Sequence, residues 1–268
     1  MNRLLSILNY SLFACLSLLI WSAVNCQAIA QEVISPQQER LALLLSSGND
    51  EQKLEALIEM GTLISGPTSR ATPKTISILG SLLQSDASPV IRALAARAME
   101  LNRDEKCLPF LLSALKNDRE PAVLKAIIYA LAYQRSPEVI ETLVRLLNDK
   151  KQEIRAASAF ALAEIGAPAS TKAFIDLLRK RGNDEDAFAR KQAVRGLGNI
   201  GDPVAIDALL TVLNRDKSSE VRRQAVFSLG RIAKAQDTKV IEALKLATLQ
   251  SDPYLAALAA SALEKFRL

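Results

Sequence analysis

One pattern of apolar, charged and small residues recurs along most of the chain. In each copy an apolar anchor is followed by apolar or small side chains at positions four, seven and eight, and in four of the copies also by an apolar residue at position eleven. The six anchors are Ile91, Val123, Ile154, Ala189, Val221 and Leu255. They lie about 31 to 35 residues apart, which leaves room for two helices of about twelve residues and two short turns.

Each copy predicts a helical hairpin. The apolar positions after an anchor fall within about 100° on a helical wheel, as in an amphipathic second helix. A Leu-rich first helix precedes it, for example at residues 139–147 and 205–213. Capping residues followed by proline, such as Ser136 and Pro137, mark helix starts. With a weaker copy around residues 54–63, we expect an all-α solenoid of about seven stacked hairpins.

The composition agrees with closely packed helices. Hydrophobic residues make up 49% of the 268-residue chain and charged residues 24%, but aromatic residues only 4%. Such a chain buries its core through small aliphatic side chains rather than through strands rich in aromatic residues. The net charge of +5 is spread over interspersed basic and acidic residues, so nucleic acid is not an expected partner.

The repeated residues resemble the short HEAT-like repeats first described in phycobilin lyases, over nearly all of residues 37–268. The large aromatic and glycine positions of tetratricopeptide repeats are absent, and so is the Thr-Pro-Leu-His tetrad of ankyrin repeats. The resemblance implies an α-solenoid, and it permits a bilin lyase or isomerase activity.

A second regularity joins acidic and basic residues. An Asp stands six residues before an Arg in four copies, which resembles the ladder of the HEAT family, where Arg reaches a carboxylate in its own or the adjacent repeat. The predicted ladder residues in these four copies are Asp86 and Arg92, Asp149 and Arg155, Asp184 and Arg190, and Asp216 and Arg222. The copy at Asp118 has Leu124 where the others have Arg, and we expect a softer junction there.

The first 30 residues have the features of a secretory signal peptide. Arg3 precedes a long apolar run, and residues 28–30 form the small-x-small pattern of a cleavage site. The predicted organisation is a signal peptide at 1–30, a linker at 31–36 and the solenoid at 37–268, in the periplasm or outside the cell. Two alternatives stay open: residues 4–24 could remain as a membrane anchor, or a lipoprotein could be cut before Cys26.

The sequence offers few groups for catalysis. It has no histidine, and cleavage after Ala30 would leave one cysteine, Cys107, in an apolar stretch where a buried thiol is expected. Residues 184–186 are expected to form a solvated acidic loop. Residues 196–201 match a dinucleotide-binding fingerprint, but they fall at the end of a predicted helix. No catalytic residue, metal or cofactor is predicted, and we expect the chain not to be an enzyme.

One face of the second helices remains as the candidate for function. Positions two, six and nine after each anchor lie opposite the buried stripe, and second helices of solenoids usually line the concave face. Exposed aromatic residues beside arginines are typical of protein-binding hot spots. The candidate partner-binding residues are Arg97, Lys125, Tyr129, Phe160, Lys191, Arg195, Arg223 and Phe227. The alternative to partner binding is that the side chains at position six pack partly against a neighbouring helix.

The sequence therefore favours a non-enzymatic scaffold of the cell envelope that holds a protein or peptide partner on its concave face. A membrane contact is expected only if the N-terminal segment stays uncleaved. Two other functions stay open. One is a bilin lyase or isomerase relative, although those proteins act on pigment proteins inside the cell, and the other is a binder of envelope polymers.

Overall fold

The computed structural model describes residues 36–65, 70–134, 136–180 and 186–266. Within these ranges the chain forms fourteen α-helices and no β-strand. The predicted signal peptide and residues 31–35 of the predicted linker lie outside the described residues, as does Asp184. In the described part, no helix combines the length and apolarity that crossing a membrane requires.

Consecutive helices pair into hairpins. We call the earlier helix of each hairpin the first helix and the later one the second helix. The first helices are α2 (Pro36–Ser47), α4 (Pro73–Ser85), α6 (Leu108–Asn117), α8 (Pro137–Leu146), α10 (Thr171–Lys180), α12 (Ile206–Arg215) and α14 (Thr238–Ala247). The second helices are α3 (Asp50–Ile64), α5 (Pro89–Asn102), α7 (Pro121–Leu131), α9 (Gln152–Ile165), α11 (Ala187–Ile200), α13 (Ser219–Ile232) and α15 (Pro253–Glu264). The short 3₁₀ turns are η1 (Glu105–Cys107), η2 (Pro168–Ser170) and η3 (Pro203–Ala205). The prediction of an all-α solenoid with about seven hairpins is confirmed.

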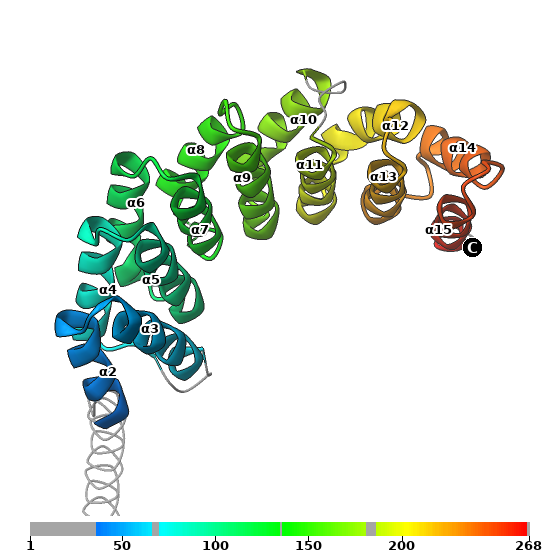
Figure 1. Ribbon diagram of the computed structural model, residues 1–268. Coiled ribbons are helices and arrows are strands. Elements are labelled where there is room, and N and C mark those ends of the chain that lie inside the picture. The colour runs from blue at the N-terminus through cyan, green and yellow to red at the C-terminus, as the bar shows by residue number, and fades with distance from the viewer. Residues whose placement is uncertain (1–35, 66–69, 135, 181–185, 267–268) are drawn as a thin grey trace, which may run out of the picture.

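The hairpins stack side by side into a curved rod with two layers (Figure 1). The first helices form the outer layer, and the second helices line the inner curve from α3 to α15. Successive second helices pack on one another along this curve. The second helices therefore form the concave face, as the sequence predicted.

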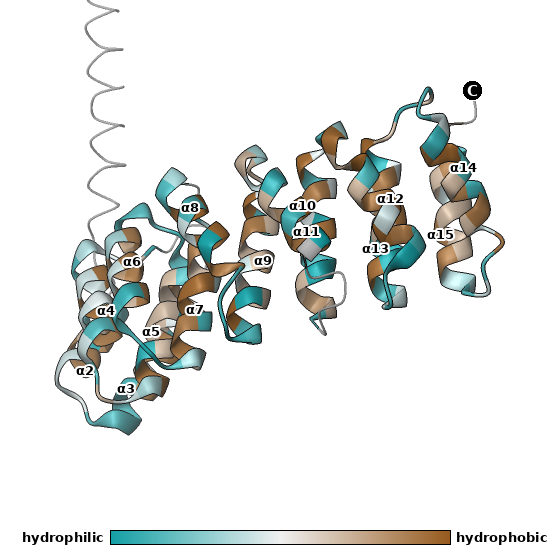
Figure 2. Cartoon of the chain, turned by 90° about the horizontal axis from the view of Figure 1, so that it is seen from above, coloured by the Kyte–Doolittle hydropathy of each residue, from teal (hydrophilic) through white to brown (hydrophobic). Residues whose placement is uncertain are grey.

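A continuous apolar core holds the two layers together. Figure 2 shows apolar residues in brown along the helices of successive hairpins, while teal polar residues gather in many of the turns. All six anchors are buried, and position seven is buried Ala, Gly or Ser in the five copies before the last. A Cβ added to Gly198 would lie 2.5 Å from Ser228 Oγ of the next repeat. Small residues therefore let neighbouring second helices approach closely.

Two sequence features take the structural roles expected of them. Residues 196–201 end α11, and Gly201 follows the helix with φ 77° in the left-handed region that favours glycine. Cys107 is fully buried, and burial raises the pKa of its thiol to about 11. The thiol is therefore protonated and shielded at neutral pH.

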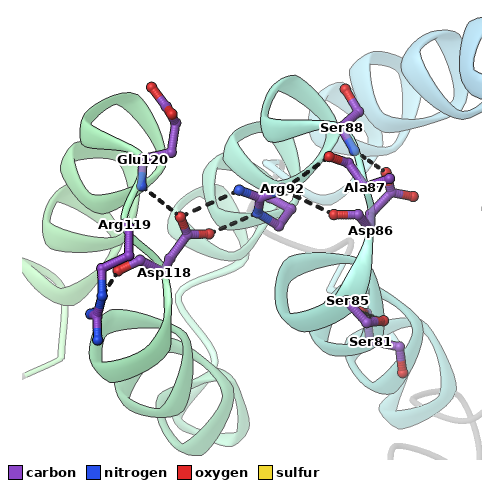
Figure 3. Close-up of polar contacts among 9 residues, drawn as sticks. All are labelled: Ser81, Ser85, Asp86, Ala87, Ser88, Arg92, Asp118, Arg119 and Glu120. Carbon is purple, nitrogen blue, oxygen red and sulfur yellow. Dashed lines mark hydrogen bonds and ion pairs between the residues drawn. The ribbon is translucent and has the colours of Figure 1, made fainter.

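Arg92 shows how successive repeats are joined (Figure 3). Its Nε and Nη2 donate to the carboxylate of Asp118, in the next repeat, at 2.7 and 3.3 Å. Its Nη1 donates to the main-chain oxygen of Asp86, in the turn before its own helix, at 3.0 Å. Burial alone would raise the pKa of Asp118, but Arg92 and the backbone N–H of Glu120 hold it below its usual range. One guanidinium thus bonds to two repeats.

The ladder pairs Arg92 and Arg190 with a carboxylate of the next repeat, which is one of the two arrangements that the sequence left open. Arg190 donates to Asp216 at 2.8 and 3.0 Å, across 26 residues. Within a copy the contact goes through the main chain, since Arg155 donates to the carbonyl oxygen of Asp149 at 3.1 Å and Arg222 to that of Asp216 at 2.9 Å. At the junction with the last repeat, Arg223 rather than its neighbour Arg222 pairs with the carboxylate of the next repeat, Asp252.

Each ladder carboxylate is also held by a hydrogen bond within its own turn. Asp216 Oδ1 accepts a hydrogen bond from the backbone N–H of Ser218 at 2.9 Å. Asp118 and Asp149 likewise each accept a hydrogen bond from the backbone N–H of the residue two positions later in the chain. At Leu124 the ladder has a gap, since this side chain packs against the core. The softer junction expected there stays a prediction.

The burial of the ladder pair predicts how much each bridge stabilises the fold. The side chains of Arg190 and Asp216 are 4% and 3% exposed, whereas those of Arg223 and Asp252 are 32% and 11% exposed. Arg190→Met would leave a buried carboxylate without its cation, so we expect the free energy of unfolding to fall by about 3–5 kcal/mol. Arg223→Met should cost about 1 kcal/mol or less, because solvent screens the pair. Urea denaturation followed by circular dichroism measures both, and equal losses would contradict a burial-dependent ladder.

Candidate functional site on the concave face

Position six of the repeat places one side chain per second helix on the inner curve. Through α5, α7, α9, α11, α13 and α15 this position holds Arg97, Tyr129, Phe160, Arg195, Phe227 and Ser261. Their exposure differs along the rod. Arg97, Phe227 and Ser261 are exposed, whereas Tyr129, Phe160 and Arg195 are half-buried.

The three half-buried side chains form a row across α7, α9 and α11, which we call the aromatic row. The rings of Tyr129 and Phe160 meet edge to face with centroids 5.3 Å apart. The guanidinium carbon of Arg195 lies 5.3 Å from the Phe160 centroid, and Arg195 Nη2 lies 2.7 Å from Glu164 Oε1. Burial, with the negative charge of Glu100, raises the pKa of Tyr129, so its hydroxyl is neutral at neutral pH. The row presents two partly exposed rings, a phenol and a guanidinium.

Phe227 continues position six beyond the aromatic row but is placed differently. Its side chain is 52% exposed. The guanidinium carbon of Arg231 lies 6.0 Å from the ring centroid, and Arg231 Nη1 donates to Asn199 Oδ1 at 2.7 Å. The alternative of partial packing therefore holds for Tyr129 and Phe160, whereas Phe227 offers an exposed ring.

Most of the predicted partner-binding cations already have acidic neighbours. Their closest ion-pair contacts are Arg97 with Glu100 at 2.7 Å, Lys191 with Glu220 at 2.8 Å, and Arg223 with Asp252 at 3.0 Å. Lys125 is exposed on α7. Arg223 also lies over the ring of Tyr254, with the guanidinium carbon 4.9 Å from the centroid. Arg223 thus takes part in the ladder between repeats, and its role as a partner-binding residue stays a prediction.

The exposed stripe of the second helices differs by one position from the predicted stripe. Position nine was expected on the surface, but Ala132, Ala163, Gly198 and Gly230 are packed between helices. Position ten is exposed in the last four repeats, where it holds Glu164, Asn199, Arg231 and Lys265. The predicted stripe did not include these four residues. The small residues at position nine were the signal that could have found them, because small side chains mark close helix contacts.

A polar cleft of about 350 Å³ lies where the ladder joins α4 and α6 (Figure 3). Its lining includes Asp86, Arg92, Asp118 and Arg119. The guanidinium of Arg92 already bonds to both neighbouring turns, so this cleft is part of the repeat junction. The described residues contain no group of three or more His, Cys, Asp or Glu arranged to hold a metal ion. The concave face is therefore the candidate site.

Comparison with known proteins places this solenoid among HEAT repeats. A family model of HEAT repeats matches residues 108–186 and 175–264. A phycobilisome maturation protein of Synechococcus elongatus is 32% identical over 123 residues, which cover 42% of this chain and 56% of that protein. A deoxyhypusine hydroxylase of Drosophila pseudoobscura pseudoobscura is 32% identical over 114 residues, which cover 41% of this chain and 36% of that protein. The chain thus spans about half and about a third of these two relatives.

Solved structures share the fold. An engineered protein has a TM-score of 0.58 and 24% identity, covering 87% of this chain and 68% of its own. The complex of CpcE and CpcF of phycocyanin lyase from Nostoc sp. has a TM-score of 0.52 and 19% identity, covering 88% of this chain and 97% of its own. At these identities the likeness is one of fold. The resemblance to HEAT-like repeats of the phycobilin-lyase type is confirmed.

The expectation that the chain is not an enzyme is wrong. The relatives and similar structures include a deoxyhypusine hydroxylase and a phycocyanin lyase, both named for catalytic activities. The expectation rested on the absence of histidine and on the single cysteine of the mature chain. A solenoid that positions two reactants can accelerate their reaction without supplying a histidine or a thiolate, because proximity and orientation lower the barrier.

Exposure along position six predicts unequal effects of removing the rings. Phe227→Ser should change the free energy of unfolding by about 0.5 kcal/mol or less, because the ring is largely in solvent. Phe160→Ser should lower it by about 2 kcal/mol, because the half-buried ring packs on Tyr129 and Arg195. Urea denaturation of the two variants tests this. A loss for Phe227→Ser as large as that for Phe160→Ser would mean that Phe227 is part of the core.

Proposed function

This chain belongs to the HEAT repeat family, and from that premise we propose that it is a maturation protein of the phycobilin-lyase type. It holds a client protein against the concave face while an open-chain tetrapyrrole pigment is joined to the client. The 32% identity to a phycobilisome maturation protein supports this proposal. The aromatic row, at the middle of the concave face, is the observation that carries it.

The aromatic row has the chemistry that an open-chain tetrapyrrole needs. Conjugated pyrrole rings pack on aromatic side chains, and Tyr129 and Phe160 offer two such rings 5.3 Å apart. The pigment's carboxylates pair with a guanidinium, which Arg195 supplies beside Phe160. The neutral hydroxyl of Tyr129 can donate a hydrogen bond to a pyrrole carbonyl.

The proposed reaction adds a nucleophilic atom of the client across a carbon–carbon double bond of the pigment. One σ bond forms, the π bond breaks, and the nucleophile's proton moves to the neighbouring carbon, so no oxidant or reductant is required. The solenoid contributes by holding the two reactants in position, which can replace a large part of the entropic barrier. This role is compatible with a chain that has no histidine.

The proposal is tested by mixing the purified full chain with pigment-free phycocyanin polypeptide and phycocyanobilin. The pigment absorbance that stays with the polypeptide after denaturation in acidic urea reports covalent attachment. We expect the chain to raise the initial rate of attachment at least about tenfold over the mixture without it. The double variant Phe160→Leu, Arg195→Gln should lose most of this increase, because it removes the ring and the cation that position the pigment.

Arg179→Gln provides a matched control. Arg179 is exposed on the outer helix α10, and the substitution also removes one guanidinium. This variant should keep the rate of the unchanged chain, and the thermal midpoints of all variants verify that they are folded. No acceleration by the unchanged chain, or equal losses for the control and the double variant, would overturn the proposed function.

We further propose that the chain is exported by its N-terminal segment, so its client lies in the periplasm or outside the cell, unlike the pigment proteins on which bilin lyases act inside the cell. Arg3, the apolar run and the small residues at 28–30 support a leader peptide that is cleaved after Ala30. N-terminal sequencing of the chain from an envelope fraction should begin at Gln31. A chain that begins at Met1 and stays in the membrane would support an anchor at 4–24, and a lipid-modified Cys26 would support a lipoprotein. Either result would contradict cleavage after Ala30.

A further inference from the structure

The two ends of the second helices differ in how their cations are neutralised. At the N-terminal ends, cations pair with acidic side chains of the following repeat. These pairs are Lys53 with Asp86, Arg92 with Asp118, Arg190 with Asp216, Lys191 with Glu220, and Arg223 with Asp252. Positive charge at this end is therefore largely used in joining repeats.

At the C-terminal ends of α13 and α15, two cations donate hydrogen bonds to neutral oxygen atoms. Arg231 Nη1 donates to the amide oxygen of Asn199 at 2.7 Å, and Lys265 Nζ donates to the carbonyl oxygen of Gly230 at 3.2 Å. Neither forms an ion pair with a carboxylate in the part of the chain that the structure describes. Both side chains are exposed. Two positive charges therefore face solvent at successive repeats.

An exposed ring lies beside these cations. Phe227 is 52% exposed, one helical turn before Arg231, and the guanidinium carbon of Arg231 lies 6.0 Å from the ring centroid. We call Phe227, Arg231 and Lys265 the C-terminal concave patch. Cations at a helix C-terminus interact favourably with the helix dipole, which accounts for part of their placement. The dipole does not account for a phenylalanine ring half in solvent beside them.

We propose that the C-terminal concave patch binds an acidic, extended segment of the client protein, with two carboxylates on Arg231 and Lys265 and an apolar side chain on Phe227. This inference rests on the proposed function, because the client is the protein held on the concave face. The two cations occupy the same position in successive repeats, and packed helices lie about 10 Å apart. A chain in the extended polyproline II conformation rises about 3.1 Å per residue with three residues per turn, so carboxylates three residues apart lie on one face and match this spacing.

Charge complementarity favours this occupant over an apolar one. A carboxylate that meets Arg231 or Lys265 finds a cation whose charge no acidic side chain of the ladder neutralises. Glu264, next to Lys265, is the nearest acid along the chain, and it leaves the patch with a net positive charge. The apolar side chain between the two carboxylates would cover the exposed face of Phe227 and remove it from water.

The test measures binding of two labelled peptides to the purified full chain by fluorescence anisotropy. One peptide has four Glu-Leu-Gly units, with carboxylates three residues apart, and the other replaces every Glu with Gln. We expect the Glu peptide to bind at least about tenfold more tightly than the Gln peptide at low salt, and to weaken as salt screens the charges. The double variant Arg231→Glu, Lys265→Glu should weaken the Glu peptide about tenfold or more, and Phe227→Ser should weaken both peptides.

The matched control reverses two charges on the outer helix of the last described hairpin. Lys239 and Lys245 are exposed on α14, so Lys239→Glu, Lys245→Glu changes the net charge by the same amount as the concave variant. It should keep the affinity within about twofold. Equal binding of the two peptides, absence of binding, or equal weakening by the control would overturn the proposal.

A second experiment with a pigment shows whether the patch binds carboxylates of the client protein or carboxylates of the pigment. Biliverdin carries two carboxylates, and its binding is measured by absorbance with the same variants. If Arg231→Glu, Lys265→Glu weakens biliverdin and leaves the Glu peptide unchanged, the patch binds pigment and the acidic-segment proposal fails. Peptide binding without any effect of the chain on pigment attachment would instead overturn the proposed function and leave this inference standing. The two failures are therefore distinguishable.

Discussion

A guanidinium buried between two repeats is held by the main chain of its own turn and by a carboxylate of the next turn, and the stacking of the hairpins depends on this bridge. Arg92 makes both contacts and Arg190 makes the contact with the next turn, with donor–acceptor distances from 2.7 to 3.3 Å. A buried charge without its partner costs several kcal/mol, so the bridge favours one docking position for the next repeat. Where it is present, as on α5 and α11, the bridge fixes the N-terminal end of the second helix, and small residues at positions seven and nine determine how closely the rest of the helix approaches its neighbour.

The sequence contains most of the information for this architecture because each local preference agrees with the repeat. Anchors such as Ile154 and Val221 are spaced for a hairpin, and all six are buried. Caps such as Ser136 and Asp202 begin a helix and a 3₁₀ turn as expected. The sequence could not show which carboxylate an Arg of the ladder binds, because the carboxylate six residues before it and the one 26 residues after it were both within reach. In the structure Asp216 accepts from Arg190 of the preceding repeat through its carboxylate and from Arg222 of its own repeat through its main-chain oxygen.

The concave face was predictable in position but not in detail. A helical wheel treats one side of a helix as buried, and on that basis positions two, six and nine are exposed. A second helix in this solenoid packs on its own first helix and on second helices at both sides. The solvent-facing stripe is therefore narrower than the wheel suggests, and it runs through positions six and ten. Phe227 lies on it, whereas Gly198 and Gly230 lie against neighbouring helices.

Which part of this narrow stripe can bind a partner depends on which of its cations already have a carboxylate neighbour. Cations near the bridges, such as Lys191 and Arg223, meet carboxylates of the following repeat, so charge at that end stabilises the rod more than it attracts a ligand. Arg231 and Lys265 lie at the opposite ends of their helices, away from the ladder, where their hydrogen bonds go to amide and carbonyl oxygens. These bonds orient the side chains without neutralising them. A carboxylate ligand can therefore bind there without breaking a contact between repeats, which allows a rigid solenoid to hold a client without losing its own stability.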